Sequence, residues 1–267
     1  MNYNWLKWLL LLFSIGYSLI GFAQKKELKI LHAMQYKIYL DEDPNKVKKL
    51  LFKIKNAEIG IKGTDKNHIS ITAIKGWKQG ENFKYEFHRI AKIDKADLTL
   101  LQDENKIDLG QNSEEQMVYW LEIPKTMSVL VVDKSMFLNK VTVANIDTDV
   151  AVNTVLSPID IQNIDGRVLA NSQAGDIVVS YDRKVNKSSI TSAGRKVTLK
   201  LLKDAKANLQ LNVVTGAIIT DFDLGEDIKK KDLKGRANMR TLNGKINGGG
   251  TKIYVMAHTI ELKKIKK

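Results

Sequence analysis

Apolar and polar residues alternate with a period of two along most of this chain, which predicts β-strands rather than helices. In the middle of the chain these alternating segments are short, and glycine, asparagine or aspartate separates them, as is typical of turns. The pattern predicts strands at 141–146, 150–153, 159–164, 168–171, 176–181, 188–191, 195–201, 207–214 and 217–222. Further strands are expected from Leu50 onward, at 98–109, at 117–123 and at 128–132. The fold is therefore expected to be all-β.

Two segments carry hairpin signals. Isoleucines alternate with polar residues on either side of the polar segment 62–67, which predicts a hairpin that contains Ile59, Ile61, Ile69 and Ile71. Near the C-terminus, Asn243-Gly244 precedes two alternating segments, and Asn-Gly is the strongest short hairpin signal. Three glycines follow at Gly248, Gly249 and Gly250, but the segment after them is strand-like. Because a phosphate-binding loop needs a helix at that point, the sequence does not predict a nucleotide site.

The chain contains a self-match with a spacing of 18 residues. Residues 141–147 match 159–165, and the match aligns Asn145 with Asn163, Asp147 with Asp165, and Asn153 with Asn171. A repeat this short predicts one coil of chain stacked on the next, with parallel pairing between coils. The expected architecture is a single-stranded β-solenoid, or β-helix, of stacked short coils wound right-handed. The aligned asparagines are expected to form hydrogen-bonded ladders at the corners.

Glycines mark the corners of the expected coils. These glycines are Gly166, Gly175, Gly194 and Gly216. They are expected to have a positive φ, because glycine adopts that conformation at little cost.

The N-terminus carries an export signal. Residues 1–23 contain Lys7 as the only charge, then an apolar run from Trp8 to Phe22, and small residues before Gln24. The sequence therefore predicts a signal peptide at 1–23, an N-terminal cap or extension at 24–58, and a β-solenoid at 59–267 that ends in a Gly-rich strand pair acting as the second cap. No transmembrane segment is expected after cleavage. The expected location is the bacterial envelope: periplasm, outer-membrane surface or extracellular space.

Composition narrows the function classes. The chain has no cysteine, so neither disulfides nor thiol chemistry is available. Its formal charge of +13 favours an anionic partner. The lysines are spread along the sequence and do not interleave with aromatic residues, which argues against nucleic acid.

The C-terminal half carries a family resemblance. A strand ending in Ser192-Ala193-Gly194, an apolar strand, the segment 207–211, Gly216 and 220–222 follow one another, and residues 243–250 close the pattern. This arrangement resembles the exported β-strand-repeat proteins labelled "putative adhesin", a domain of unknown function common in Bacteroidetes. The resemblance covers the chain from Ala57 to its end. It implies a non-enzymatic surface protein and brings no catalytic residues with it.

Few residues suggest chemistry. The stacked Asp147 and Asp165 could hold calcium, but the ladder lacks the six or so oxygens that such a site needs. A polysaccharide-acting β-helix would place carboxylates and basic residues on an outer face, and the candidates are Asp160, Asp176, Asp182, Arg167 and Arg183. Nothing distinguishes these from solvated strand residues. No catalytic residue, cofactor or metal ligand is therefore predicted.

The sequence thus predicts a non-enzymatic exported structural or interaction protein, an adhesin-like β-solenoid. A protein or glycan on a surface is the expected partner. The alternatives are a periplasmic scaffold or an envelope-stress-associated binding protein and, less favoured, a polysaccharide-acting β-helix enzyme. The sequence does not predict the oligomeric state.

Overall fold

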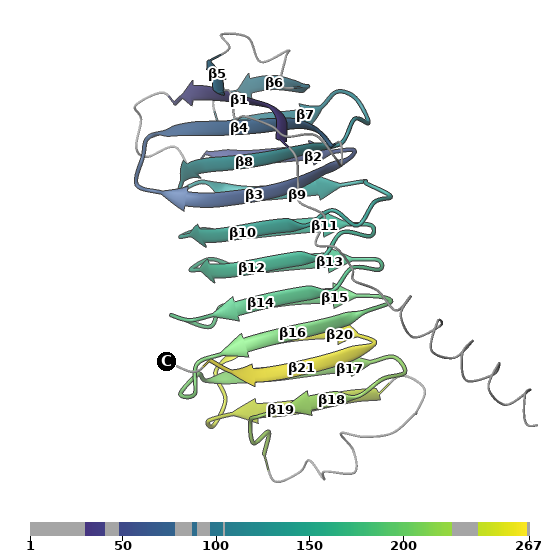
Figure 1. The fold of residues 1–267 in the computed structure, drawn as a ribbon. Helices are drawn as coiled ribbons and strands as arrows, with labels where there is room; N and C mark the ends of the chain where they lie inside the picture. Colours follow the sequence, from purple (N-terminus) through teal and green to yellow (C-terminus); the bar gives the residue numbers. More distant parts are fainter. Residues whose placement is uncertain are drawn as a thin grey trace, which may run out of the picture.

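The computed structural model describes residues 30–40, 48–77, 87–89, 97–103, 105–225 and 240–265, and their secondary structure is entirely β. The strands form two large sheets of mixed strand direction that lie face to face in an elongated stack (Figure 1). The predicted signal peptide lies outside the described residues. None of the described residues forms a helix long and apolar enough to cross a membrane.

The eleven-stranded sheet is called sheet A, and the ten-stranded sheet is called sheet B. Sheet A contains, in spatial order, β18 (Ile218–Thr220), β21 (Thr259–Lys264), β16 (Lys196–Leu201), β14 (Ile177–Tyr181), β12 (Ile159–Ile164), β10 (Val141–Ile146), β3 (Ala57–Thr64), β8 (Met117–Pro124), β4 (His68–Trp77), β1 (Ile30–Tyr39) and β5 (Phe87–Arg89). Sheet B contains, in spatial order, β19 (Arg240–Ile246), β17 (Ala207–Val213), β20 (Thr251–Ala257), β15 (Ser188–Ser192), β13 (Val168–Ser172), β11 (Val150–Thr154), β9 (Ser128–Asp133), β2 (Lys49–Ile54), β7 (Lys106–Gln111) and β6 (Leu98–Asp103).

The predicted parallel stacking with an 18-residue offset is confirmed. From β9 to β16 the chain alternates between the two sheets, and we call a strand of sheet B and the sheet A strand after it a coil. Val141 pairs with Ile159 between β10 and β12, and Val150 pairs with Val168 between β11 and β13. One coil later the offset grows to 20 residues, because Val168 pairs with Ser188.

The core lies between the two sheets. Alternate side chains of each strand point inward, and Val141, Val143, Val152 and Ile161 are fully buried. Complete burial of one such side chain contributes about 1.5–3 kcal/mol relative to exposure. The inward side chains of successive coils lie next to one another, so the core runs without interruption along the stack.

Two coils are inserted out of sequence order. The coil β2–β3 lies between β7–β8 and β9–β10, although β7 and β8 come later in the chain. The C-terminal coil β20–β21 lies between β15–β16 and β17–β18, and Figure 1 shows its yellow strand β21 beside β16. The expectation that 24–58 and the C-terminal strand pair are caps is therefore wrong for β2, β20 and β21, because each pairs on both edges.

Both predicted hairpins are wrong. β3 and β4 do not pair with each other, because β8 lies between them and pairs with both. Asn243-Gly244 lies within β19, which pairs with β17 and not with β20. The turn before β20 uses Asn247, Gly248 and Gly249 instead, all with positive φ. The segment 98–109 is also not one strand, since β6 and β7 form an antiparallel pair there.

Three of the four corner glycines, Gly166, Gly175 and Gly216, serve close approach rather than a positive φ, whereas a Cβ on Gly194 would make only an ordinary contact at 3.4 Å. Gly166, Gly175, Gly194 and Gly216 do not have positive φ values. A Cβ on Gly166 would lie 2.1 Å from the carbonyl carbon of Thr148, in the preceding coil. Left-handed backbone occurs instead at Asn145 (φ 60°) and Asn163 (φ 55°), because a short polar side chain tolerates that conformation.

A row of buried polar side chains crosses sheet B at the C-terminal ends of four successive strands. Equivalent positions on β9, β11, β13 and β15 are occupied by Asp133, Thr154, Ser172 and Ser192. The Thr154 hydroxyl donates to Ser172 Oγ at 2.9 Å, and Ser192 donates to the Gly175 carbonyl at 2.8 Å. Asp133 accepts from the Ser135 backbone N–H at 2.7 Å and from the Ser157 hydroxyl. Burial raises the pKa of Asp133, and these two hydrogen bonds oppose the shift.

Candidate functional site

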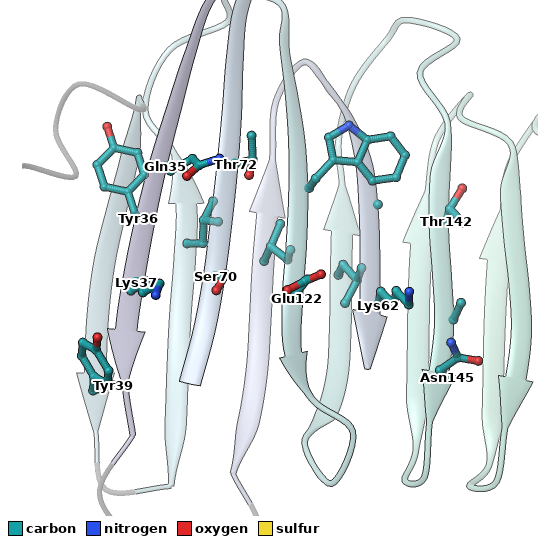
Figure 2. Close-up of a pocket in the computed structure, with 16 residues that line it drawn as sticks. Gln35, Tyr36, Lys37, Tyr39, Lys62, Ser70, Thr72, Glu122, Thr142 and Asn145 are labelled. Atoms are coloured by element: carbon teal, nitrogen blue, oxygen red, sulfur yellow. The ribbon is translucent and has the colours of Figure 1, made fainter. Parts of the chain in front are cut away.

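An open groove with a volume of about 1030 Å³ lies on the outer face of sheet A. Strands β1, β4, β8, β3 and β10 form its floor, and Figure 2 shows its side chains standing on these strands. Because outward residues of neighbouring strands lie in register, the lining side chains form rows across the sheet. We call this feature the Trp120 groove.

Trp120 is the largest side chain of the groove. Its neighbours in β8, Tyr119 and Leu121, point into the core and are buried, so the alternation of the strand turns Trp120 outward. Half of its surface is exposed, at 49 %. Trp120 pairs with Gly60 on β3, and a Cβ on Gly60 would lie 2.0 Å from the indole ring. The ring therefore lies on the bare backbone of Gly60.

Hydrogen-bonding side chains flank the indole on both sides. One row across the sheet consists of Gln35, Thr72, Trp120, Gly60 and Thr142. The Thr72 hydroxyl thus stands on the strand next to Trp120, and the Thr142 hydroxyl stands on the other side, beyond Gly60. Such groups both donate and accept hydrogen bonds.

A second row carries charge, and it consists of Lys37, Ser70, Glu122 and Lys62. Glu122 accepts a hydrogen bond from Lys66, and this bond lowers the pKa of Glu122. The groove therefore mixes positive and negative groups and has no strong net charge.

This arrangement suits an uncharged, hydroxyl-rich ligand. The exposed face of an indole offers a flat apolar surface with a polar edge, and the side chains around it can pair with hydroxyl groups. Among the described residues, no group of three or more histidine, aspartate or glutamate side chains could hold a metal ion.

The predicted asparagine ladder is confirmed at one pair of positions. Asn163 Nδ2 donates to Asn145 Oδ1 at 3.0 Å, and Asn145 also lines the Trp120 groove. Asn153 and Asn171 lie in register on sheet B, but both are exposed. The remaining repeat glycine, Gly250, follows Gly249 in the turn before β20.

Each carboxylate of the stacked aspartate pair has a cation of its own. Asp147 lies 3.4 Å from Lys125 Nζ, and Asp165 lies 3.3 Å from Arg183 Nη1. These ion pairs compensate the repulsion that two stacked carboxylates would otherwise feel.

The residues considered for polysaccharide cleavage are not brought together in one site. Asp160 pairs with Lys140 at 2.9 Å, Arg167 pairs with Asp149 at 3.0 Å, and Arg183 pairs with Asp165. Asp176 accepts from the Lys196 backbone N–H at 3.1 Å, and Asp182 is exposed beyond the end of β14. The absence of catalysis stays a prediction.

Sequence reasoning missed Trp120 and Gly60. The signal for Trp120 was present, since a tryptophan at an outward position of the alternating segment 117–123 is exposed on a sheet face. The sequence holds no comparable signal for Gly60, because the position of Gly60 beside Trp120 depends on the out-of-order insertion of the coil β2–β3.

No family model matches the chain, and no curated protein matches its sequence. A crystal structure of a "putative cell adhesion protein" from Clostridium sporogenes is similar over 90 % of this chain and 100 % of that chain, at 12 % identity and a TM-score of 0.40. This similarity is too distant to assign a function. Membership in the adhesin-type repeat family stays a prediction.

Proposed function

We propose that this protein is an exported, non-enzymatic binding protein, an adhesin-like β-solenoid, whose Trp120 groove binds a neutral polysaccharide on a cell surface. The observation that carries the proposal is the half-exposed indole lying on Gly60, with hydroxyl and amide side chains beside it.

Rigidity supports a binding role. Trp120, Thr72 and Thr142 stand on paired strands whose inward neighbours are buried, so the groove keeps its shape without a ligand. A preformed site loses little conformational entropy on binding, and this favours affinity. The right-handed solenoid winding is part of the proposal, and the parallel pairing of successive coils supports a solenoid.

Affinity electrophoresis with soluble β-glucan, xylan, mannan and dextran tests the proposal. The purified chain from residue 24 onward should be retarded by at least one of these polymers. Trp120→Ala should weaken the affinity behind that retardation about 5- to 150-fold, because stacking of one ring on an aromatic side chain contributes about 1–3 kcal/mol, by analogy with nucleobases. Gly60→Ala should also weaken it, because the new methyl group displaces the indole.

Gly110→Ala is the matched control, since a Cβ on Gly110 meets no atom within 4 Å. Retardation of Trp120→Ala equal to that of the parent would contradict the proposal, as would a parent that no polymer retards. Release of reducing ends from the retained polymer, abolished by Asp176→Ala, would overturn the non-enzymatic assignment.

Protease treatment of intact cells tests the location. A surface protein is lost from intact cells, whereas a periplasmic protein is protected until lysis. Protection would contradict the surface assignment and favour the periplasmic scaffold instead.

A further inference from the structure

A second groove, with a volume of about 770 Å³, lies on the outer face of sheet B where β13, β15, β20, β17 and β19 meet. It is on the other sheet from the Trp120 groove and shares no lining residue with it. We call it the basic groove.

Four exposed cations line the basic groove: Arg167, Lys187, Lys252 and Lys245. They form one row across the strands. Lys252 pairs with Asn208, which pairs in turn with Lys245 on its other side. Lys187 and Arg167 each directly precede the first paired residues of β15 and β13, so they continue the row. Residues far apart in sequence thus form one basic line.

Acidic side chains do not balance this row. Among the described residues, no carboxylate lines the basic groove. Arg167, at one end, pairs with Asp149 at 3.0 Å. Lys187, Lys245 and Lys252 form no ion pair with any residue in the described part of the chain. Like charges on directly opposed strand positions destabilise a sheet, so this row favours an anionic ligand.

A second row supplies neutral contacts. It runs parallel to the cations and consists of Leu169, Ser189, Tyr254, Gln210 and Asn243. A phenol ring, a hydroxyl and two amides can thus contact the uncharged parts of a ligand whose charges face the lysines.

We propose that the basic groove binds a linear acidic polysaccharide, one with a carboxylate on its sugar units. Neighbouring strands are ~4.8 Å apart, which is close to the length of one sugar unit in an extended chain. Successive carboxylates can therefore meet Arg167, Lys187 and Lys252 on three adjacent strands, and Lys245 lies one strand further on, beyond Asn208. The amides and Tyr254 contact the hydroxyl groups and ring faces.

Other polyanions fit less well. A groove for single-stranded nucleic acid needs several aromatic side chains on which bases stack, and Tyr254 is the only aromatic residue that lines the described groove. A membrane-binding face needs a cluster of exposed large apolar side chains, whereas Leu169 is the only such residue in the second row.

The inserted C-terminal coil creates the site. Lys252 and Tyr254 belong to β20, which lies between β15 and β17. Because β20 is inserted there, Lys187 lies on one side of it and Asn208 on the other, and Lys252 connects the two.

Binding of polygalacturonate to the chain from residue 24 onward tests the inference, with dextran, single-stranded DNA and anionic phospholipid vesicles as comparison ligands. The parent should bind polygalacturonate more tightly than any of the other three, and its affinity should fall with added salt. The double variant Lys187→Gln/Lys252→Gln should bind about tenfold or more weakly, because two aligned charges are removed from the groove.

Lys200→Gln/Lys203→Gln is the matched control, since it removes the same charge from two exposed lysines outside the groove. It should change the affinity less than threefold. Equal weakening in both double variants would overturn the inference, as would tighter binding to DNA or vesicles. Circular dichroism should show all variants folded.

The inference does not depend on the proposed function. Trp120→Ala should leave polygalacturonate binding unchanged, because Trp120 stands on the other sheet. Loss of polygalacturonate binding in Trp120→Ala would contradict the placement of this ligand in the basic groove.

Discussion

Asn163 donates a hydrogen bond from its side-chain amide to the side-chain oxygen of Asn145, across 3.0 Å and 18 residues of sequence. Both residues have left-handed backbone, so the same conformation recurs at the same corner of two successive coils. The contact joins neighbouring coils where the ladder of backbone hydrogen bonds is interrupted by that conformation.

Replacement of Asn163 should separate the contribution of its side-chain hydrogen bond from that of its left-handed backbone. Asn163→Ala loses the hydrogen bond and places an ordinary residue at a left-handed position, so it should lower the free energy of unfolding by about 1–3 kcal/mol. Asn163→Gly keeps the backbone conformation and should cost less. Urea denaturation measures both. Asn153→Ala, at an exposed strand position, is the control and should change stability by less than about 0.5 kcal/mol. Equal effects of the alanine and glycine variants at 163 would contradict the backbone argument.

Gly166 should tolerate no side chain. Its Cβ would meet the Thr148 carbonyl group of the preceding coil, at 2.1 Å from the carbon and 2.3 Å from the oxygen. Gly166→Ala must push the two coils apart and should cost about 1–3 kcal/mol. Gly110→Ala, with open space around it, should be close to neutral. Thermal unfolding of the two variants checks the difference, and similar melting temperatures would refute the close approach.

The alternation of buried and exposed positions predicts opposite outcomes at adjacent residues. Ile161 is fully buried, so Ile161→Asp places a charge in the core and should abolish cooperative unfolding or the fold itself. Asp160 points outward and pairs with Lys140, and an exposed ion pair contributes at most about 1 kcal/mol. Asp160→Ala should therefore keep the β-sheet circular dichroism. If both variants lost it equally, the strand register would be wrong.

Stability should depend on pH through Asp133. Its pKa is raised by burial, so the folded state binds this proton more tightly than the unfolded state. The stabilising contribution of Asp133 to the free energy of unfolding is therefore largest at low pH. It falls as the pH rises from the ordinary aspartate pKa of about 3.9 through the raised pKa of the folded state. Asp133→Asn removes this dependence and keeps an acceptor for the Ser135 N–H.

Urea denaturation between pH 3.5 and pH 7 measures the effect. The stability of Asp133→Asn relative to the parent should increase with pH in this window. Gly110→Ala, which removes no ionisable group and whose added Cβ meets no atom within 4 Å, should show no such trend. A constant difference between Asp133→Asn and the parent would contradict the raised pKa.

The strands of the central coils were predictable, and their order at the two ends was not. The strand 159–164 was predicted without error, because alternation and the 18-residue match are local signals. The insertion of β2–β3 and β20–β21 has no local signal. Any strand with an apolar inner face can extend a parallel stack, so the pattern of apolar positions does not reveal which strand lies next to β9 or β15.

The same reason explains what was missed at both grooves. The scatter of the lysines along the sequence, without interleaved aromatic residues, argues against nucleic acid and gives no sign of a basic row, whereas stacking places Lys187 beside Lys252. The wide sequence separation of Gly60 and Trp120 likewise hides their contact. Residues far apart in sequence converge in each groove through strand order, which the pattern of apolar positions leaves open.

Fluorescence of Trp120 is the most direct test of the central proposal. The chain has four tryptophans, and Trp5 and Trp8 lie in the predicted signal peptide. Residues 24–267 carrying Trp77→Phe therefore contain Trp120 as their only indole. Saturation with the retained neutral polysaccharide should shift or quench the emission, with the same dissociation constant as in electrophoresis. Unchanged emission at a polymer concentration that retards the protein would contradict binding at the Trp120 groove.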